Sequence, residues 1–343
     1  MSPEDKHKQL TEIAFRILPS YVELLKQKTL DPDTLDAVTT RIRQIYAGLA
    51  PEKEFAAAVN WMSNVVAIHS LDQTPIPNYS GAEKFQVPDL LAIVKYKGHL
   101  LPALIEVKKR NDDALKWRED YVQSLKRYAD ALRMPLLVAW NFANVWTLTD
   151  IRHFEKKVTD YHLDFNTALR ENLMGEIFGD LMIRLTERVK FFVDANVAEK
   201  LPDDLRALVP EGKYRMTITG AGFTVDDKKI NLSTALFWAF NTAATRNEVK
   251  RLGVQKIRIE HVPLADNMFS LTYLWQSLAT PIEGENVEVD WDAVMREPLS
   301  ITGSEVRREL REGISKGVVK YVLEQVPHTM PDFLSALTPK KQE

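Results

Sequence analysis

The sequence contains no cysteine among its 343 residues. This absence excludes disulfides, cysteine-ligated zinc and iron–sulfur sites, and thiol catalysis. The seven histidines are scattered, and none belongs to an HExxH pair that would bind a catalytic zinc ion. No GxxxxGK[ST] segment is present, so we expect no built-in ATP motor.

Long apolar runs are also missing. No segment approaches the roughly 18–20 apolar residues that a membrane-spanning helix needs, and we expect no membrane partner. The first ten residues, MSPEDKHKQL, are charged and lack the apolar core of a signal peptide, so we expect a cytoplasmic protein. The net charge of −3 argues against a protein that coats nucleic acid nonspecifically. It allows an enzyme that concentrates positive charge in one groove.

The order of apolar patterns predicts two domains. Three helices are expected near the start, over residues 4–28, 31–46 and 51–66. A β-β-α-β-β pattern follows up to residue 150, with its helix over residues 113–132. We therefore predict an α/β domain over residues 1–204 that opens with helices.

A polar stretch containing Pro202 and Pro210 separates this domain from the rest of the chain. Beyond it, strand-like and helical segments alternate, and residues 233–251 are expected to form a helix. We therefore predict a second domain, of α+β class, over residues 205–343.

Two strand-like runs, VPDLLAIVKY and LPALIEVKK, flank a turn at Gly98. In an antiparallel hairpin centred between Lys97 and Gly98, Asp89 and Glu106 fall close together. Glu106 and Lys108 share one face of their strand, because residues two apart point the same way. Their apolar neighbours make these charges costly unless they pair or bind a metal.

Two converging carboxylates beside a lysine suit phosphodiester hydrolysis. That reaction needs a divalent cation to neutralise the phosphate, an activated water, and stabilisation of the leaving oxygen. Mg²⁺ prefers oxygen ligands and keeps several of its waters. A few carboxylates on rigid elements, with a cation near the attacking water, are therefore a sufficient contribution from the protein.

Val87-Pro88-Asp89, then sixteen residues, then Glu106-Val107-Lys108 resembles the signature of PD-(D/E)XK nucleases. This superfamily includes restriction enzymes, Holliday-junction resolvases and RecB-type exonucleases. The resemblance implies a restriction-endonuclease-like mixed sheet flanked by helices, with Mg²⁺ as cofactor and Mn²⁺ as a substitute. It implies Asp89, Glu106 and the Val107 carbonyl as metal ligands. Lys108 would position the attacking water or help to deprotonate it.

The family also has a glutamate on an upstream helix, and Glu52 in PEKEF resembles that position. Glu54 is the alternative. We prefer Glu52, because Phe55, Ala56 and Val59 share its helix face and that face should point inward. The alternative interpretation is that both acids simply stabilise a helix N-terminus.

Gln123-Ser-Leu-Lys-Arg-Tyr128 resembles the Gln…Tyr motif of RecB-like nucleases, and it places Gln123 among the catalytic residues. Its spacing is one residue longer than QxxxY, which puts the role of Tyr128 in question. The alternative is a polar surface residue and a half-buried aromatic. The following MPLLVAWNFANVWTLTD resembles the strand-turn-strand in nuclease domains of type I restriction motor subunits. The resemblance covers about residues 50–150, and none covers residues 205–343.

Basic and aromatic residues follow the motif. Five cations are candidate phosphate contacts, with a solvated helix face as the alternative: Lys109, Arg110, Lys116, Lys126 and Arg127. Three tryptophans either stack on unpaired bases or belong to the core: Trp117, Trp140 and Trp146.

Together these features predict a Mg²⁺-dependent DNA endonuclease in host defence, such as restriction or antiviral immunity. DNA repair as the pathway and RNA as the substrate are alternatives. The C-terminal domain is expected to recognise a target, a protein partner or a small ligand, so a signal- or partner-gated nuclease is a second hypothesis. A catalytically idle nuclease fold used for binding is a third. A homodimer is expected if both strands of a duplex are cut.

Overall fold

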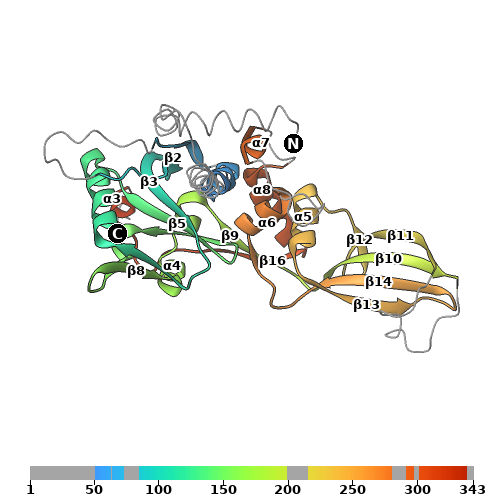
Figure 1. The fold of residues 1–343 in the computed structure, drawn as a ribbon. Helices are drawn as coiled ribbons and strands as arrows, with labels where there is room; N and C mark the ends of the chain where they lie inside the picture. The colour runs from blue at the N-terminus through green and yellow to red at the C-terminus, as the bar shows by residue number, and fades with distance from the viewer. Residues whose placement is uncertain are drawn as a thin grey trace, which may run out of the picture.

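The computed structural model of the chain describes residues 51–62, 64–72, 85–198, 215–279, 291–296 and 301–337. The helices expected over residues 4–28 and 31–46, and the boundary expected near residue 205, lie outside the described residues. Within the described ranges, no helix is long and apolar enough to cross a membrane. In Figure 1 a mixed sheet with its helices lies at one end of the molecule and an antiparallel sheet projects at the other.

A five-stranded mixed sheet forms the centre of the N-terminal half. Its strands are β1 (Val65–Ser70), β2 (Leu90–Tyr96), β3 (His99–Lys109), β5 (Leu136–Phe142) and β6 (Val145–Asp150), in the order β1-β2-β3-β5-β6. Neighbours are antiparallel except β3 and β5, which run parallel. A parallel pair needs a crossover connection, which helix α3 (Glu119–Leu132) supplies. The predicted α/β fold, a mixed sheet flanked by helices, is confirmed.

The β2–β3 hairpin has the predicted centre. Its two turn residues, Lys97 and Gly98, have positive φ angles of 47° and 89°, which is the conformation of a two-residue type I′ turn. The hairpin register pairs Leu90 with Ile105. One residue further along the same register, Asp89 stands opposite Glu106.

Two helices cover opposite faces of the mixed sheet. The helix of residues 51–61, which is shorter than predicted, packs Phe55 on the face that carries Val107. Helix α3 packs Leu125 on the other face, which carries Leu104. Because alternate strand residues point to opposite faces, Glu106 shares the Leu104 face and points toward α3. The sheet thus places the motif carboxylate under the start of α3.

The helix predicted over residues 113–132 is wrong in its first part. Residues Ala114–Arg118 form strand β4, whose buried and exposed residues alternate, and α3 begins only at Glu119. Strand β4 belongs to a small sheet of order β4-β8-β7, with β7 at Glu155–Lys156 and β8 at Asp160–Asp164. The remaining elements of this half are η1 (Ile151–His153), α4 (Phe165–Arg170) and the π-helical turn η2 (Met174–Phe178).

The C-terminal half is α+β, as predicted. A five-stranded antiparallel sheet has the order β12-β11-β10-β14-β13, from β10 (Val189–Val197), β11 (Met216–Val225), β12 (Lys228–Ile230), β13 (Thr245–Arg251) and β14 (Lys256–Pro263). A three-stranded sheet has the order β15-β9-β16, from β9 (Leu181–Leu185), β15 (Phe269–Ser270) and β16 (Val319–Glu324). The helices are α5 (Thr234–Thr242), α6 (Leu271–Ala279), α7 (Trp291–Arg296) and α8 (Gly303–Ser315). The helix predicted over residues 233–251 therefore ends at Thr242, and strand β13 follows it.

Strand pairing crosses the predicted domain boundary. Strands β9 and β10 precede residue 204, yet β9 pairs with β15 and β16, and β10 pairs with β11 and β14. We therefore propose that the C-terminal domain begins at β9 rather than at residue 205.

The chain returns to the N-terminal half after β16. We call residues 325–337 the return segment; it contains the short helix α9 (Asp332–Ser335). Leu334 is 0% exposed and belongs to the same apolar cluster as Phe55 and Val107. Met330 and Phe333 pack against that cluster. Residues far beyond the mixed sheet in sequence thus complete its core.

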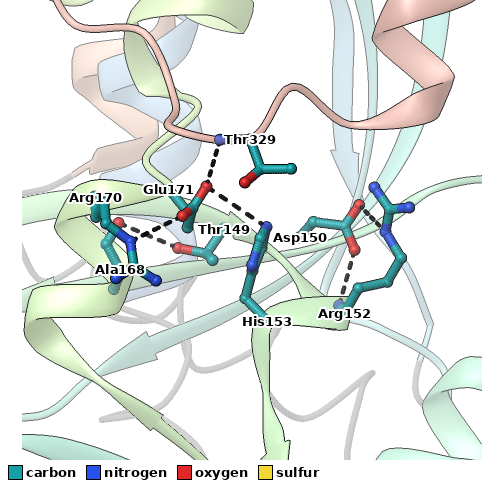
Figure 2. Close-up of polar contacts among 8 residues, drawn as sticks. All are labelled: Thr149, Asp150, Arg152, His153, Ala168, Arg170, Glu171 and Thr329. Carbon is teal, nitrogen blue, oxygen red and sulfur yellow. Dashed lines mark hydrogen bonds and ion pairs between the residues drawn. The ribbon is translucent and has the colours of Figure 1, made fainter.

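Polar contacts hold the return segment as well. Figure 2 shows the Glu171 carboxylate between the backbone of Thr329, the side chain of Arg170 and the ring of His153. The Thr329 N–H donates to Glu171 at 2.8 Å, and Arg170 Nε donates at 2.9 Å. Burial alone would raise the pKa of Glu171, but these two donors and the charges of His153 and Arg170 outweigh it and hold this pKa below its ordinary value. Arg152 joins Asp150 to Asp332 of the return segment.

Candidate active site

Asp89, Glu106 and Lys108 converge where β2 begins and β3 ends. Lys108 Nζ lies 3.6 Å from Asp89 Oδ2 and forms an ion pair with Glu106 Oε1. The backbone N–H of Val107 donates to Asp89 Oδ2 at 2.7 Å. Asp89 is only 4% exposed and Glu106 only 1%. The hairpin therefore buries two carboxylates beside one cation, as its register predicts.

Tyr121, in the first turn of α3, is a fourth member of this cluster. Its hydroxyl donates to Glu106 Oε1 at 2.5 Å. Burial raises the pKa of the Tyr121 phenol, and the Glu106 carboxylate raises it further. The phenol therefore stays protonated and acts as a donor. In the sequence, the place of Tyr121 at the start of α3 is indicated only by the acidic pair Glu119 and Asp120, because acidic residues are typical of the first turn of a helix.

Burial and neighbouring charges together set the pKa values of Glu106 and Lys108. It raises the pKa of Glu106 to about 7, and the negative charge of Asp89 adds to the rise, while Lys108 opposes it. Burial alone would lower the pKa of Lys108, but the carboxylates of Glu106 and Asp89 outweigh it and raise this pKa. Lys108 is therefore an ammonium at neutral pH, whereas Glu106 is near the midpoint of its titration.

The cluster suits a hard divalent cation. Glu106 Oε2 is buried and accepts no hydrogen bond, so one carboxylate oxygen is left for another ligand. Among the described residues, no group of three or more His, Asp or Glu side chains forms a ready metal cage. Mg²⁺ is commonly held by one or two carboxylates, with waters and substrate phosphates completing its shell. Asp89 and Glu106 fit that donor set.

The two upstream glutamates lie in different surroundings. Glu52 is partly buried, and its charge raises the pKa values of both Lys108 and Tyr121. Glu54 is buried and engaged elsewhere: its Oε2 lies 2.9 Å from Lys109 Nζ. The choice of Glu52 over Glu54 stays a prediction, and these surroundings agree with it.

Gln123 forms a hydrogen bond to Tyr161. Its Nε2 donates to the Tyr161 hydroxyl at 3.0 Å, which ties α3 to strand β8. Tyr128 is partly buried and packs on the apolar cluster under α3. Tyr121, rather than Gln123, is the residue of this helix that the structure brings to Glu106. A catalytic role for Gln123 stays a prediction.

The candidate phosphate contacts differ in exposure. Arg110 and Lys116 are exposed, whereas Lys126 is partly buried over the Tyr161 ring at 5.3 Å from its centroid. Arg127 is partly buried on α3, and Lys109 is paired with Glu54. The three tryptophans that were weighed for base stacking are all core residues: Trp117, Trp140 and Trp146.

Substituting Tyr121 by phenylalanine tests its contact with Glu106. The change removes one hydroxyl and keeps the ring that packs edge-on against Trp117. Groups that orient a metal ligand are typically worth about 10- to 100-fold in metal affinity or activity, so we expect about a tenfold higher Mg²⁺ concentration for half-maximal cleavage. A Mg²⁺ titration of the cleavage rate measures it. An unchanged titration would show that the hydroxyl does not orient Glu106.

Comparison with known proteins supports the resemblance to PD-(D/E)XK nucleases. Residues 75–178 match the family model of archaeal Holliday junction resolvases (Hjc). A solved structure of Archaeoglobus fulgidus Hjc, described as a Holliday junction resolvase from an archaeal hyperthermophile, aligns with 36% of this chain and 87% of that chain, at 18% identity and a TM-score of 0.28. No curated protein matches the chain significantly. Residues 75–178 are therefore similar to the Hjc family, which belongs to the PD-(D/E)XK nucleases, and the resemblance predicted from the sequence is confirmed.

Proposed function

We propose that the chain is a Mg²⁺-dependent endonuclease that hydrolyses phosphodiester bonds in DNA. The observation that carries this proposal is the convergence of Asp89, Glu106 and Lys108 in one buried cluster. These residues occupy the motif positions of a segment that is similar to a nuclease family. A retired site would not need to keep two buried carboxylates and their cation, which disfavours the catalytically idle alternative.

The proposed roles follow from the cluster. Asp89 and Glu106 would hold Mg²⁺, with the Val107 carbonyl and Glu52 as further ligands, and Mn²⁺ would substitute for it. The bound ion supplies charge neutralisation at the phosphate. Lys108 is charged in this environment, so it would orient the attacking water and the phosphate as a donor. Tyr121 donates to Glu106 Oε1, so Oε2 would be the oxygen that is available to hold the ion.

The substrate class follows from the family. The Hjc relatives are named for Holliday junctions, so four-way DNA junctions belong among the substrates to be tested. Exposed cations near the site, Arg110 and Lys116, would contact DNA phosphates. Two cuts in one duplex or junction need two sites, so a homodimer is part of the proposal. Roles in host defence and a cytoplasmic location stay predictions.

Cleavage assays with a lysine substitution test this function. Purified protein is incubated with plasmid, four-way junction, single-stranded DNA and RNA, in Mg²⁺, Mn²⁺ or EDTA. We expect metal-dependent cutting of DNA, and Lys108→Gln should lower its rate by about 100-fold or more. Lys250→Gln is the matched control, since Lys250 also pairs with a buried glutamate on a strand, at 2.8 Å from Glu260. Cutting in EDTA, or full activity of Lys108→Gln, would refute the proposal.

A partner-gated nuclease is the second candidate. Helix α6 of the C-terminal half reaches the N-terminal half, where Gln276 Nε2 donates to Glu54 at 3.4 Å. The return segment gives a further connection, since Gln325 accepts a hydrogen bond from Asn172 at 3.0 Å. A ligand of the C-terminal half would therefore act on elements that support the site. Activity that appears only after cell extract is added would favour this candidate.

A further inference from the structure

We propose that a cavity between the two halves of the chain binds the nucleobase next to the phosphate that is cut. This inference rests on the proposed nuclease function and adds a base pocket to it. The cavity, called the interface cavity here, has a volume of about 280 Å³. The N-terminal half and helix α6 contribute three lining residues each: Glu54, Lys109 and Asn144 on one side, Tyr273, Gln276 and Ser277 on the other. Trp291 of α7 completes the lining, and its ring is stacked on Trp275, with 5.3 Å between the ring centroids.

The interface cavity adjoins the candidate active site through β3. Lys109 is the last residue of β3 and directly follows Lys108. Consecutive strand residues point to opposite faces and lie about 3.3 Å apart along the strand. The carboxylate cluster and the cavity therefore lie on the two sides of one strand end. A DNA strand that is bound at Lys108 is within reach of both.

The charges in the lining cancel, which disfavours a phosphate as the occupant. Lys109 Nζ lies 2.9 Å from Glu54 Oε2. The other carboxylate oxygen, Glu54 Oε1, accepts from Gln276 Nε2 at 3.4 Å. Phosphate sites typically offer cations and N–H groups whose charge is not already compensated. The described lining of the cavity instead favours a neutral ligand.

The remaining groups match the edge and the face of a base. Tyr273 is 46% exposed, and exposed aromatic rings stack on bases without sequence preference. Asn144 and Gln276 carry amides that both donate and accept hydrogen bonds, and Ser277 carries a hydroxyl. The cavity is smaller than the roughly 300–1,000 Å³ of drug-sized ligand sites, so its size suits one base.

A base enters such a cavity only when it is unpaired. Enzymes that accept a base into a pocket act on single strands or extrude the nucleotide, and extrusion costs least at mismatched positions. The inferred substrate class is therefore DNA with an unpaired nucleotide beside the cut, such as a flap, a mismatch or a single strand.

Fluorescence of a base analogue tests the pocket without requiring cleavage. Single-stranded oligonucleotides that carry 2-aminopurine, whose emission falls on stacking, are titrated with the Lys108→Gln protein. We expect emission to fall by about twofold on binding, as stacking on Tyr273 predicts. Adding Tyr273→Ala should abolish the fall, and Tyr273→Phe, which keeps the ring, should preserve it. The control Phe237→Ala removes an exposed ring of α5 that does not line the cavity, and it should leave the fall unchanged. An equal fall with Tyr273→Ala would overturn the proposal.

Cleavage rates give a second, independent readout. Wild-type protein is given DNA with one unpaired base beside the mapped cut, or with an abasic site there. We expect the base-bearing DNA to be cut about tenfold faster, and Tyr273→Ala should bring the ratio close to one. If wild-type protein cuts the base-bearing and the abasic DNA at equal rates, the base pocket is overturned and the nuclease function is not. Emission that depends on Tyr273 without any cleavage would instead refute the nuclease function and leave the pocket standing. If neither a change in emission nor cleavage is observed, the nuclease function and the base pocket are both overturned.

Discussion

Replacing Glu106 by glutamine is expected to lower the rate of DNA cleavage by about 100- to 1,000-fold, the usual cost of losing one electrostatic contact to a reacting centre. Glutamine has nearly the same shape, but it lacks the charge that the buried Oε2 would present to Mg²⁺. Initial rates of plasmid cleavage over a range of Mg²⁺ concentrations measure the effect. A rate within about threefold of wild type at saturating Mg²⁺ would show that Glu106 is no essential ligand.

The chain offers a closely matched control for this substitution. Glu176 also accepts from a tyrosine and pairs with a lysine: Tyr96 Oη donates to it at 2.5 Å, and Lys97 Nζ lies 3.0 Å away. The two glutamates differ in the net shift of their pKa. Burial alone would raise the pKa of Glu176, but its two partners outweigh burial and lower this pKa, whereas the pKa of Glu106 is raised. Glu176→Gln should therefore leave cleavage unchanged. A large loss with this control would mean that the effect of Glu106→Gln is structural.

The same Glu106→Gln substitution is expected to raise the free energy of unfolding at neutral pH without metal. Burial raises the pKa of Glu106 from 4.5 to about 7. A raised pKa contributes stability that is fully present below the unfolded value and is lost as the pH rises through the folded value. Glutamine stays neutral at every pH. The variant therefore becomes more stable than wild type as the pH rises from 4.5 to about 7, and the difference in the free energy of unfolding reaches about 3 kcal/mol at most. Urea unfolding below, within and above this window measures the gain, and a difference independent of pH would contradict it.

Leu334→Ala is expected to lower the free energy of unfolding by about 2–5 kcal/mol, the range for buried leucines. Leu334 is fully buried in the core that Phe55 and Val107 share. Loss of its side chain leaves a cavity in the N-terminal half, although the residue lies near the other end of the sequence. Urea unfolding, followed by tryptophan fluorescence, measures the loss.

The control for this substitution is Leu323→Ala on β16. Leu323 is 47% exposed, and surface substitutions usually change the free energy of unfolding by less than about 0.5 kcal/mol. Equal losses at Leu323 and Leu334 would contradict the docking of the return segment.

Local signals were sufficient to predict the hairpin that carries the site. Gly98 indicates the turn, and alternation along β3 places Glu106 and Lys108 on one face. The start of α3 is marked only by the acidic pair Glu119 and Asp120, because Arg118 precedes it and makes no side-chain capping bond. The apolar pattern therefore predicts a helix that begins six residues early, at Asp113, and it does not indicate that Tyr121 lies in the first turn.

Contacts distant in sequence were beyond prediction for a different reason. Leu334 pairs with a core whose other members lie more than 150 residues earlier, and no local pattern distinguishes it from a surface leucine. Likewise, strand β13, with the sequence TRNEVKR, has no clear alternation of apolar and polar residues. It forms a strand because it pairs with β14. Tertiary pairing overrides weak local preference in such segments.

The return segment also has a consequence for synthesis of the chain. A ribosome completes η2, the end of the sequence that resembles a nuclease, well before it reaches residues 325–337. At about 5–20 residues per second, the interval is on the order of ten seconds. During that time the N-terminal half lacks Leu334 and the Thr329 contact to Glu171. Translation that stops early therefore yields an N-terminal half with an incomplete core, so the finished fold requires synthesis to continue through the return segment.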